Sequence, residues 1–220
     1  MKRVAILVDG GFYRKRAANL FGEKSAQDRA DELENYCRMH LKSKQNKDAE
    51  LYRVFYYDCP PSDKNIYHPF LKKGVNLKKE PMYNWMNTFI DRLKSKRKFA
   101  IRLGRLSDNE ASYVLKSEVV KALFSGKKEI KDIVSEDFQL NIKQKTMDMK
   151  LGTDIASMSL KKQVDQIILI AGDSDFVPAS KLARREGIDF IFDPMGQNIN
   201  ADLNEHIDGI RSKIKNFPQK

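Results

Sequence analysis

A run of five apolar residues at 167–171, Ile-Ile-Leu-Ile-Ala, is followed directly by Gly172-Asp173-Ser174-Asp175. An unbroken run rich in β-branched residues predicts a strand that is buried on both faces, as in a parallel sheet. In open α/β sheets, ligands bind at the carboxyl ends of such strands. The stretch therefore predicts an α/β fold, and it places Asp173 and Asp175 where that fold keeps its active site.

The beginning of the chain repeats this pattern. Residues 4–8, Val-Ala-Ile-Leu-Val, predict a second buried strand that runs into Asp9. At the other end of the chain, residues 176–186 predict a helix and residues 188–192 a further strand. Strands and helices that alternate in this way favour parallel βαβ units over a β-sandwich.

The middle of the chain is expected to hold both kinds of element. Helices are predicted at 12–20, 26–42, 83–93, 110–124 and 153–161, and strands at 51–57, 99–106 and 138–145. In residues 60–136, aromatic side chains interleave with lysines, which suits a positive groove with stacking platforms but equally a surface whose aromatics pack inward. We expect a single domain over 1–220 with a lineage-specific, basic and aromatic-rich insertion at about 60–136.

The charge of the chain favours an anionic partner. Lys and Arg number 41 against 30 Asp and Glu, which gives a net charge of +11. A basic excess beside clustered carboxylates suits a metal-dependent enzyme that acts on nucleic acid. Solvated lysines alone give the same total in many proteins, so the charge does not decide between these readings.

The cysteines and the N-terminus indicate a cytoplasmic protein. Cys37 and Cys59 are far apart in the sequence and form no CxxC motif, which argues against a disulfide framework and a thiolate zinc site. Asp9 interrupts the first apolar run far short of a signal-peptide core or a membrane span. No membrane association is expected.

Two further aspartates, Asp148 and Asp154, lie six residues apart. On one helix this spacing would place them on different faces. We therefore expect Asp148 in a loop after a strand and Asp154 early in the helix that follows. An aspartate in a first helical turn can instead serve only the helix dipole, and this reading of Asp154 stays open.

We hypothesise that five aspartates meet at one end of the sheet: Asp9, Asp148, Asp154, Asp173 and Asp175. Like charges about 5 Å apart repel by about 3 kcal/mol at an effective dielectric near 20, a large share of a domain's stability. Mg²⁺ offsets such repulsion because it prefers oxygen ligands, and it keeps waters and substrate phosphate oxygens in its shell. The pattern favours metal-assisted phosphodiester hydrolysis over glycosidase chemistry, which needs only two carboxylates.

The residues around these aspartates resemble the NYN domain family, a branch of the PIN-like metal-dependent nucleases that includes the bacterial LabA-type proteins. The resemblance rests on three segments: Val8-Asp9-Gly10-Gly11, Lys145 to Leu151 with Asp154, and Gly172 to Phe176 with Pro178. Their order and spacing agree with the family. The resemblance covers nearly the whole chain except about 60–136, which is longer than the family's minimal core.

This resemblance implies a three-layer PIN-like (Rossmann-like) α/β fold with a central, mainly parallel sheet. It also implies ribonuclease activity that depends on Mg²⁺ or Mn²⁺, with RNA as the partner. The sequence does not fix the oligomeric state, and a homo-oligomer is compatible with it. By position it makes acidic-site residues of Asp9, Asp148, Asp154 and Asp173, with Asp175 as an additional ligand. In one departure, Phe12 stands where many family members carry Asn.

Three residues are candidates for binding the substrate: Ser174, Lys145 and Lys150. Ser174 lies between the two aspartates and could donate a hydrogen bond to a phosphate, or be an ordinary turn hydroxyl. The lysines flank Asp148 and could contact the scissile phosphate, or be solvated. Asp58 ends a predicted strand and is a weaker candidate, because Asp-Cys-Pro-Pro is also ordinary turn chemistry.

Three functions compete at this point. The leading one is a metal-dependent ribonuclease in which water attacks phosphorus and leaves 3′-hydroxyl and 5′-phosphate ends. The alternative, motivated by Phe12 and the basic charge, is an RNA-binding module of the same fold that has lost catalysis. A small-substrate phosphohydrolase of the haloacid-dehalogenase type is less favoured, because it needs Asp-x-Asp after the first strand and Gly11 stands at the second position.

Overall fold

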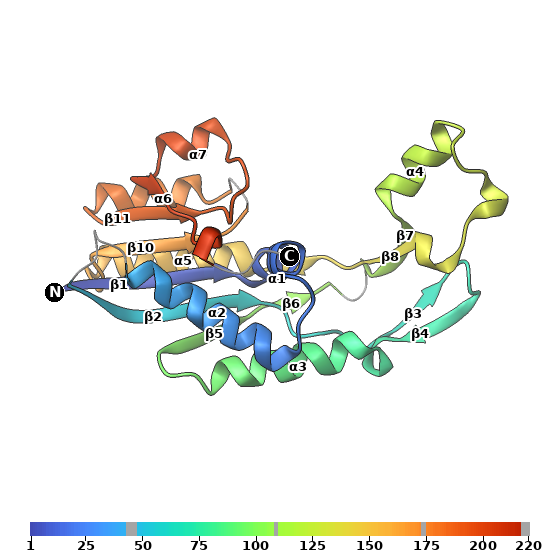
Figure 1. Ribbon diagram of the computed structural model, residues 1–220, viewed down its shortest axis with the longest axis horizontal. Helices are drawn as coiled ribbons and strands as arrows, with labels where there is room; N and C mark the ends of the chain where they lie inside the picture. The colour runs from blue at the N-terminus through green and yellow to red at the C-terminus, as the bar shows by residue number, and fades with distance from the viewer. Residues whose placement is uncertain (43–47, 108–109, 173–174, 217–220) are drawn as a thin grey trace.

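The structure is a computed structural model, and it describes residues 1–42, 48–107, 110–172 and 175–216. Its centre is a six-stranded sheet in the order β12-β11-β10-β1-β2-β5, and every neighbouring pair is parallel (Figure 1). The six strands are β1 (Lys2–Asp9), β2 (Ala49–Asp58), β5 (Phe99–Leu103), β10 (Gln166–Ile170), β11 (Asp189–Asp193) and β12 (Gly209–Ile210). The predicted α/β class and parallel sheet are confirmed.

Helices cover both faces of the sheet and complete three layers. On one face lie α1 (Gly10–Phe21), α2 (Ala26–Leu41) and α3 (Pro81–Lys94). On the other lie α5 (Met147–Leu160), α6 (Val177–Arg185) and α7 (Ala201–Glu205). Residues 4–8 of β1 are all apolar because the strand is buried on both faces: Ile6 and Val8 belong to the first core and Ala5 and Leu7 to the second.

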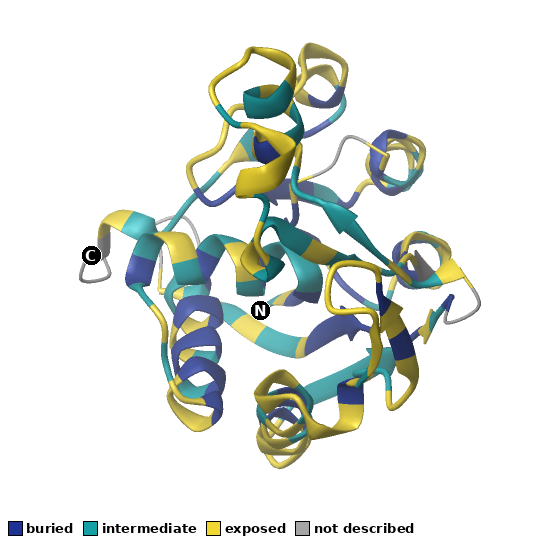
Figure 2. Cartoon of the chain, turned by 90° about the vertical axis from the view of Figure 1, so that its right-hand side faces the viewer, coloured by how far each residue is buried: buried dark blue, intermediate teal, exposed yellow. Residues whose placement is uncertain are grey.

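A further group of elements forms an arm that stands away from the sheet in Figure 1 and faces the viewer in Figure 2. It contains β3 (Asn65–His68), β4 (Lys73–Asn76), β7 (Ser112–Leu115), α4 (Ser117–Phe124) and β8 (Phe138–Asn141). The hairpins β3–β4 and β7–β8 are joined through His68, whose ring centroid lies 4.3 Å from Tyr113 and 5.1 Å from Phe138. Residues 60–136 thus contribute elements to the arm but also α3 and β5 to the central layers.

Three predicted elements have other bounds because their residues pair elsewhere. The strand expected at 99–106 leaves the sheet after Leu103, and β6 (Arg105–Leu106) pairs antiparallel with β9 (Gln144–Lys145). The strand expected at 138–145 divides into β8 and β9 for the same reason. The helix expected from 110 begins only at Ser117, since Ser112–Leu115 are β-formers that pair with β8.

Helix α5 begins at Met147, six residues before the predicted start at Thr153. Thr146 before it has a positive φ of 72°, and Asp148 lies in the first turn, where the N-terminal dipole favours a carboxylate. Gly152 is accommodated within the helix. The predicted loop position of Asp148 and the first-turn position of Asp154 are therefore both wrong, and the two residues share one helix.

Candidate active site

Asp9 lies at the carboxyl end of β1 and fixes the start of α1. It is the N-cap of that helix, and its Oδ1 accepts a hydrogen bond of 3.1 Å from the backbone N–H of Phe12. The next residue has to be glycine, because a Cβ at Gly10 would lie 2.4 Å from the Tyr56 ring and 2.7 Å from Oδ2 of Asp58. This close approach sets the Asp9 carboxyl directly beside the end of β2.

The Asp9 carboxyl is poorly balanced by charge. Burial, followed by the nearby carboxylates of Asp58 and Asp148, raises its pKa to about 6 from 3.8, and the hydrogen bond from Phe12 only partly opposes this. Among the acids proposed from the sequence, Asp9 and Asp148 are thus close enough to interact. The arrangement is one in which a divalent cation would lower the electrostatic cost.

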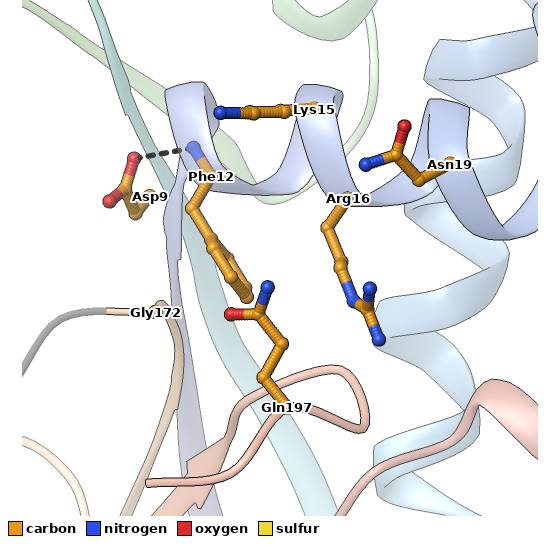
Figure 3. Close-up of a pocket in the computed structure, with 7 residues that line it drawn as sticks. All are labelled: Asp9, Phe12, Lys15, Arg16, Asn19, Gly172 and Gln197. Atoms are coloured by element: carbon orange, nitrogen blue, oxygen red, sulfur yellow. Dashed lines mark hydrogen bonds between the residues drawn. The ribbon is translucent and has the colours of Figure 1, made fainter. Parts of the chain in front are cut away.

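A cavity of about 460 Å³ opens beside Asp9, as Figure 3 shows. Its lining comes from β1, from one side of α1, from the end of β10 and from the turn after β11: Asp9, Phe12, Lys15, Arg16, Asn19, Gly172 and Gln197. A volume of this size suits a small-molecule or nucleotide ligand. The cavity brings the first and the tenth strands to one site, as the sequence predicted for their carboxyl ends.

Asp175 is exposed, in the turn between β10 and α6. Asp173 and Ser174 lie outside the described residues, although they directly follow Gly172, which lines the cavity with Asp9. Asp148 is likewise exposed, in the first turn of α5. Asp148 is near enough to Asp9 to raise the pKa of that carboxyl, and the convergence of all five aspartates stays a prediction.

Asp154 has a different environment. Its Oδ2 accepts hydrogen bonds from the Tyr57 hydroxyl at 2.8 Å and from Nε of Arg102 at 3.0 Å. Burial and the Asp154 carboxylate raise the pKa of Tyr57, so this hydroxyl stays protonated as the donor. Asp154 lines a second cavity with Arg102 and Lys150, separate from the one beside Asp9.

The two lysines proposed to bind substrate lie near this second cavity. Nζ of Lys150 donates a hydrogen bond of 2.5 Å to the carbonyl oxygen of Leu103, at the end of β5. The backbone of Lys145 belongs to β9, and its side chain lies outside the described part. Lys150 therefore reaches the rim of the sheet on the side of Asp154.

Two other strand-end acids are structural. Asp58 is fully buried, and Arg14 contacts it at 2.9 Å while the Tyr56 hydroxyl donates to it at 2.7 Å. Asp193 is also fully buried and accepts from Tyr36 on α2 and from Ser212 near the C-terminus, each at 2.6 Å. Both acids are held by fixed donors, so neither is offered to a ligand.

Apart from Phe12, sequence reasoning missed the cavity residues on α1 and after β11. One signal was available, because Lys15, Arg16 and Asn19 are spaced i, i+1 and i+4 and so lie on one side of the helix. Polar residues at this spacing mark a side that a core does not cover. Gln197 gave no signal, because its position depends on how the turn after β11 meets α1.

The chemistry of the donors fits a hard divalent cation, since carboxylate oxygens are what Mg²⁺ and Mn²⁺ take. Within the described ranges alone, no group of three or more His, Cys, Asp or Glu side chains is arranged to hold a metal. Asp173, which completes the sequence motif, is not part of those ranges. None of the helices in those ranges combines the length and the apolar character needed to cross a membrane.

Comparison with known proteins identifies a domain family. The family model of the NYN domain matches residues 84–203, which include most of α3, then β5, α5, β10 and the segment with Asp173 but not Asp9. The match thus extends into 60–136 and omits the first strand, unlike the coverage expected from the sequence. It is to the NYN domain as such, so the LabA-type branch stays a prediction.

The chain was also compared with solved structures and with curated proteins. A crystal structure of a protein of unknown function from Vibrio parahaemolyticus is similar over 95% of this chain and 91% of that chain, with 13% sequence identity and a TM-score of 0.48. No curated protein matches the sequence.

Proposed function

Because this chain belongs to the NYN domain family, within the PIN-like nuclease superfamily, we propose that it is a metal-dependent ribonuclease whose active site lies at the carboxyl end of β1. One observation supports this most directly. Asp9 is a strand-end carboxyl whose pKa is raised by burial and by neighbouring carboxylates, and it opens onto a cavity of about 460 Å³. Such a carboxyl is ready for a cation rather than already paired.

The proposed metal ligands are Asp9, Asp148, Asp173 and Asp175, and the fifth predicted acid, Asp154, is proposed to support the site because Tyr57 and Arg102 already hold its carboxylate. When bound, Mg²⁺ or Mn²⁺ would supply activation of the attacking water and stabilisation of the leaving oxygen. Asp9 is held in place for this role by its N-cap hydrogen bond to the N–H of Phe12. In the proposed reaction water attacks phosphorus, the bond to the 3′ oxygen breaks, and that oxygen takes a proton.

The remaining chain groups bind and orient the RNA. Ser174, Lys145 and Lys150 are proposed to contact its phosphates, and the net charge of +11 favours its approach. A cytoplasmic setting belongs to the proposal, since Cys37 and Cys59 are buried free thiols. The insertion at about 60–136 remains part of the proposed single domain.

The test is cleavage of labelled single-stranded RNA, duplex RNA and single-stranded DNA with Mn²⁺ or with excess EDTA. We expect metal-dependent products with 5′-phosphate and 3′-hydroxyl ends from RNA, and none from Asp9→Asn or Asp173→Asn. Asp63→Asn is the matched control, because Asp63 is exposed and lies two residues before β3 of the arm. Unchanged cleavage in EDTA, or by Asp9→Asn, would contradict the proposal.

The second candidate function is RNA binding without catalysis. It is favoured by Phe12, whose ring packs against Gly172 at the position where many relatives carry Asn. This function predicts tight, salt-dependent binding of RNA with no product in Mg²⁺ or Mn²⁺. Product formation that requires the metal would exclude it.

A further inference from the structure

One face of α1 forms a wall of the cavity beside Asp9. Phe12, Lys15, Arg16 and Asn19 lie along it at i, i+3, i+4 and i+7, so one aromatic ring is followed by two cations and an amide (Figure 3). The opposite face of the same helix carries the buried Tyr13 and Ala17 of the core. The helix therefore presents a polar face with one aromatic residue to this cavity.

The opposite wall is fitted closely to the Phe12 ring. A Cβ at Gly172 would lie 2.5 Å from Cδ2 and Cε2 of Phe12, so a glycine is required where β10 ends. Nε of Arg16 donates a 2.9 Å hydrogen bond to the carbonyl oxygen of Met195 and so ties α1 to the turn after β11. That turn also carries Gln197, whose amide faces the cavity near the ring.

The two cations of this wall are available to an anion. In the described part of the chain, neither Lys15 nor Arg16 forms an ion pair, and the single hydrogen bond of Arg16 uses only Nε. By contrast, their neighbour Arg14 is paired with the buried Asp58 at 2.9 Å. Two neighbouring cations beside a site proposed to hydrolyse phosphodiesters suit a phosphate group as their ligand.

We propose that this cavity holds one unpaired nucleotide of an RNA strand, with its base against the Phe12 ring and its phosphates against Lys15 and Arg16. The amides of Gln197 and Asn19 lie at the cavity wall, where they meet the edge of the base. A base in a duplex is stacked and paired and does not reach such a cavity, so the substrate is single-stranded at this point. The inference rests on the proposed function, because it takes Asp9 to lie beside the scissile phosphate.

The test is a binding cycle in excess EDTA, where no metal-dependent cleavage occurs. Octaribonucleotides with a 5′ fluorophore, each with one abasic position in turn, are titrated against wild type, Phe12→Leu and Phe12→Tyr by anisotropy. Leu keeps apolar packing against Gly172 without an aromatic ring, and Tyr keeps the ring. For wild type and Phe12→Tyr we expect one abasic position to weaken binding roughly 5- to 100-fold, the size of one stacked base.

For Phe12→Leu we expect the same abasic position to cost less than about twofold, because its partner ring is already gone. Lys15→Gln should flatten the dependence of log affinity on log salt by about 0.7. Lys181→Gln removes the charge of an exposed lysine on α6, away from the cavity, and should leave the slope of log affinity against log salt nearly unchanged. Equal sensitivity of wild type and Phe12→Leu to every abasic position would overturn the inference.

Binding and cleavage fail separately in this design. If one abasic position alone weakens RNA binding but no metal-dependent products form, the nucleotide site is supported and the nuclease function is contradicted. Metal-dependent cleavage with no such position would do the opposite.

Discussion

Two of the predicted aspartates, Asp9 after β1 and Asp154 on α5, differ in whether positively charged or hydrogen-bonding groups contact their carboxylates. We call these positions the two ends of the acidic site. Beside β1, Asp9 faces Asp58 and Asp148, and its pKa rises to about 6. Across α5, Asp154 is already held by the Tyr57 hydroxyl and by Arg102. Aspartates that a motif groups together are therefore not equivalent in the fold. Asp9 has carboxylate neighbours, whereas Asp154 has a cationic one in Arg102.

The largest expected effect is loss of cleavage in Asp9→Asn. Changes to groups that merely support metal ligands typically cost 10- to 100-fold in activity. Removal of a proposed ligand should therefore lower the rate of metal-dependent RNA cleavage by more than about 100-fold. Single-turnover cleavage in Mn²⁺ measures this, with RNA affinity in EDTA as the control, and a loss of affinity that accounts for the whole effect would place Asp9 outside the chemistry.

The same substitution should stabilise the metal-free protein. The pKa of Asp9 is about 6 in the folded chain and 3.8 when exposed, so the folded state binds this proton more tightly than the unfolded state does. The stabilising contribution of the protonated form is complete below about pH 3.8 and is lost as the pH rises through about 6. The resulting cost of ionised Asp9 is at most about 3 kcal/mol at 1.36 kcal/mol per pH unit.

Urea unfolding of wild type and Asp9→Asn in EDTA, at several pH values, measures that cost. Asn retains an oxygen that can cap α1, so the variant isolates the charge. It should be the more stable protein at pH 8, and the advantage should disappear near pH 4. An Asp9→Asn protein that is less stable at every pH would mean that the carboxylate is paired after all.

The sheet and the helices that cover it follow from the sequence because their signals are local. Buried parallel strands such as 167–171 are apolar throughout, and the amphipathic helices between them have a 3.6-residue period. The start of α5 was missed because Thr146 adopts a positive φ and Gly152 stays helical, neither of which a periodicity records. The pairing of β7 with β8 in the arm was missed because more than twenty residues separate the two strands in the sequence.

The candidate site also has features that the sequence predicts and features that depend on the fold. The strand-end position of Asp9 was predicted correctly because the five residues before it, 4–8, are all apolar. Nothing in the sequence indicated that Arg102 would approach Asp154, since the pair depends on how β5 lies beside β2. The neighbours that balance a carboxylate therefore depend on the fold, whereas the strand-end position of Asp9 can be read from the sequence.

A smaller effect is expected for Asp154→Asn. Its partner Arg102 is 41% exposed and the aspartate 26%, so loss of this ion pair should cost about 1 kcal/mol or less in stability. Because these partners already balance the carboxylate, we expect about a 10-fold reduction in cleavage, as for a group that supports the site. Tyr57→Phe removes only the hydroxyl donor and serves as the matched control.

A loss in Asp154→Asn as large as that in Asp9→Asn would erase the distinction between the two ends. It would mean that Arg102 gives way when the metal binds and that Asp154 then becomes a ligand. Measuring the Mn²⁺ concentration for half-maximal rate separates the cases, since a lost ligand raises it and a lost support leaves it nearly unchanged.

The smallest effect is expected for Lys150→Gln, on the side of Asp154. Its Nζ already donates to the Leu103 carbonyl, so the lysine has a structural use besides any contact with RNA. We expect RNA affinity to fall about two- to threefold and the salt slope to flatten by about 0.7, the share of one phosphate contact on a single strand. Anisotropy titrations over a range of salt concentrations measure both, with Lys161→Gln as control, because Lys161 is exposed directly after the C-terminal end of α5. An unchanged slope would confine phosphate binding to the Asp9 side and so sharpen the contrast between the two ends.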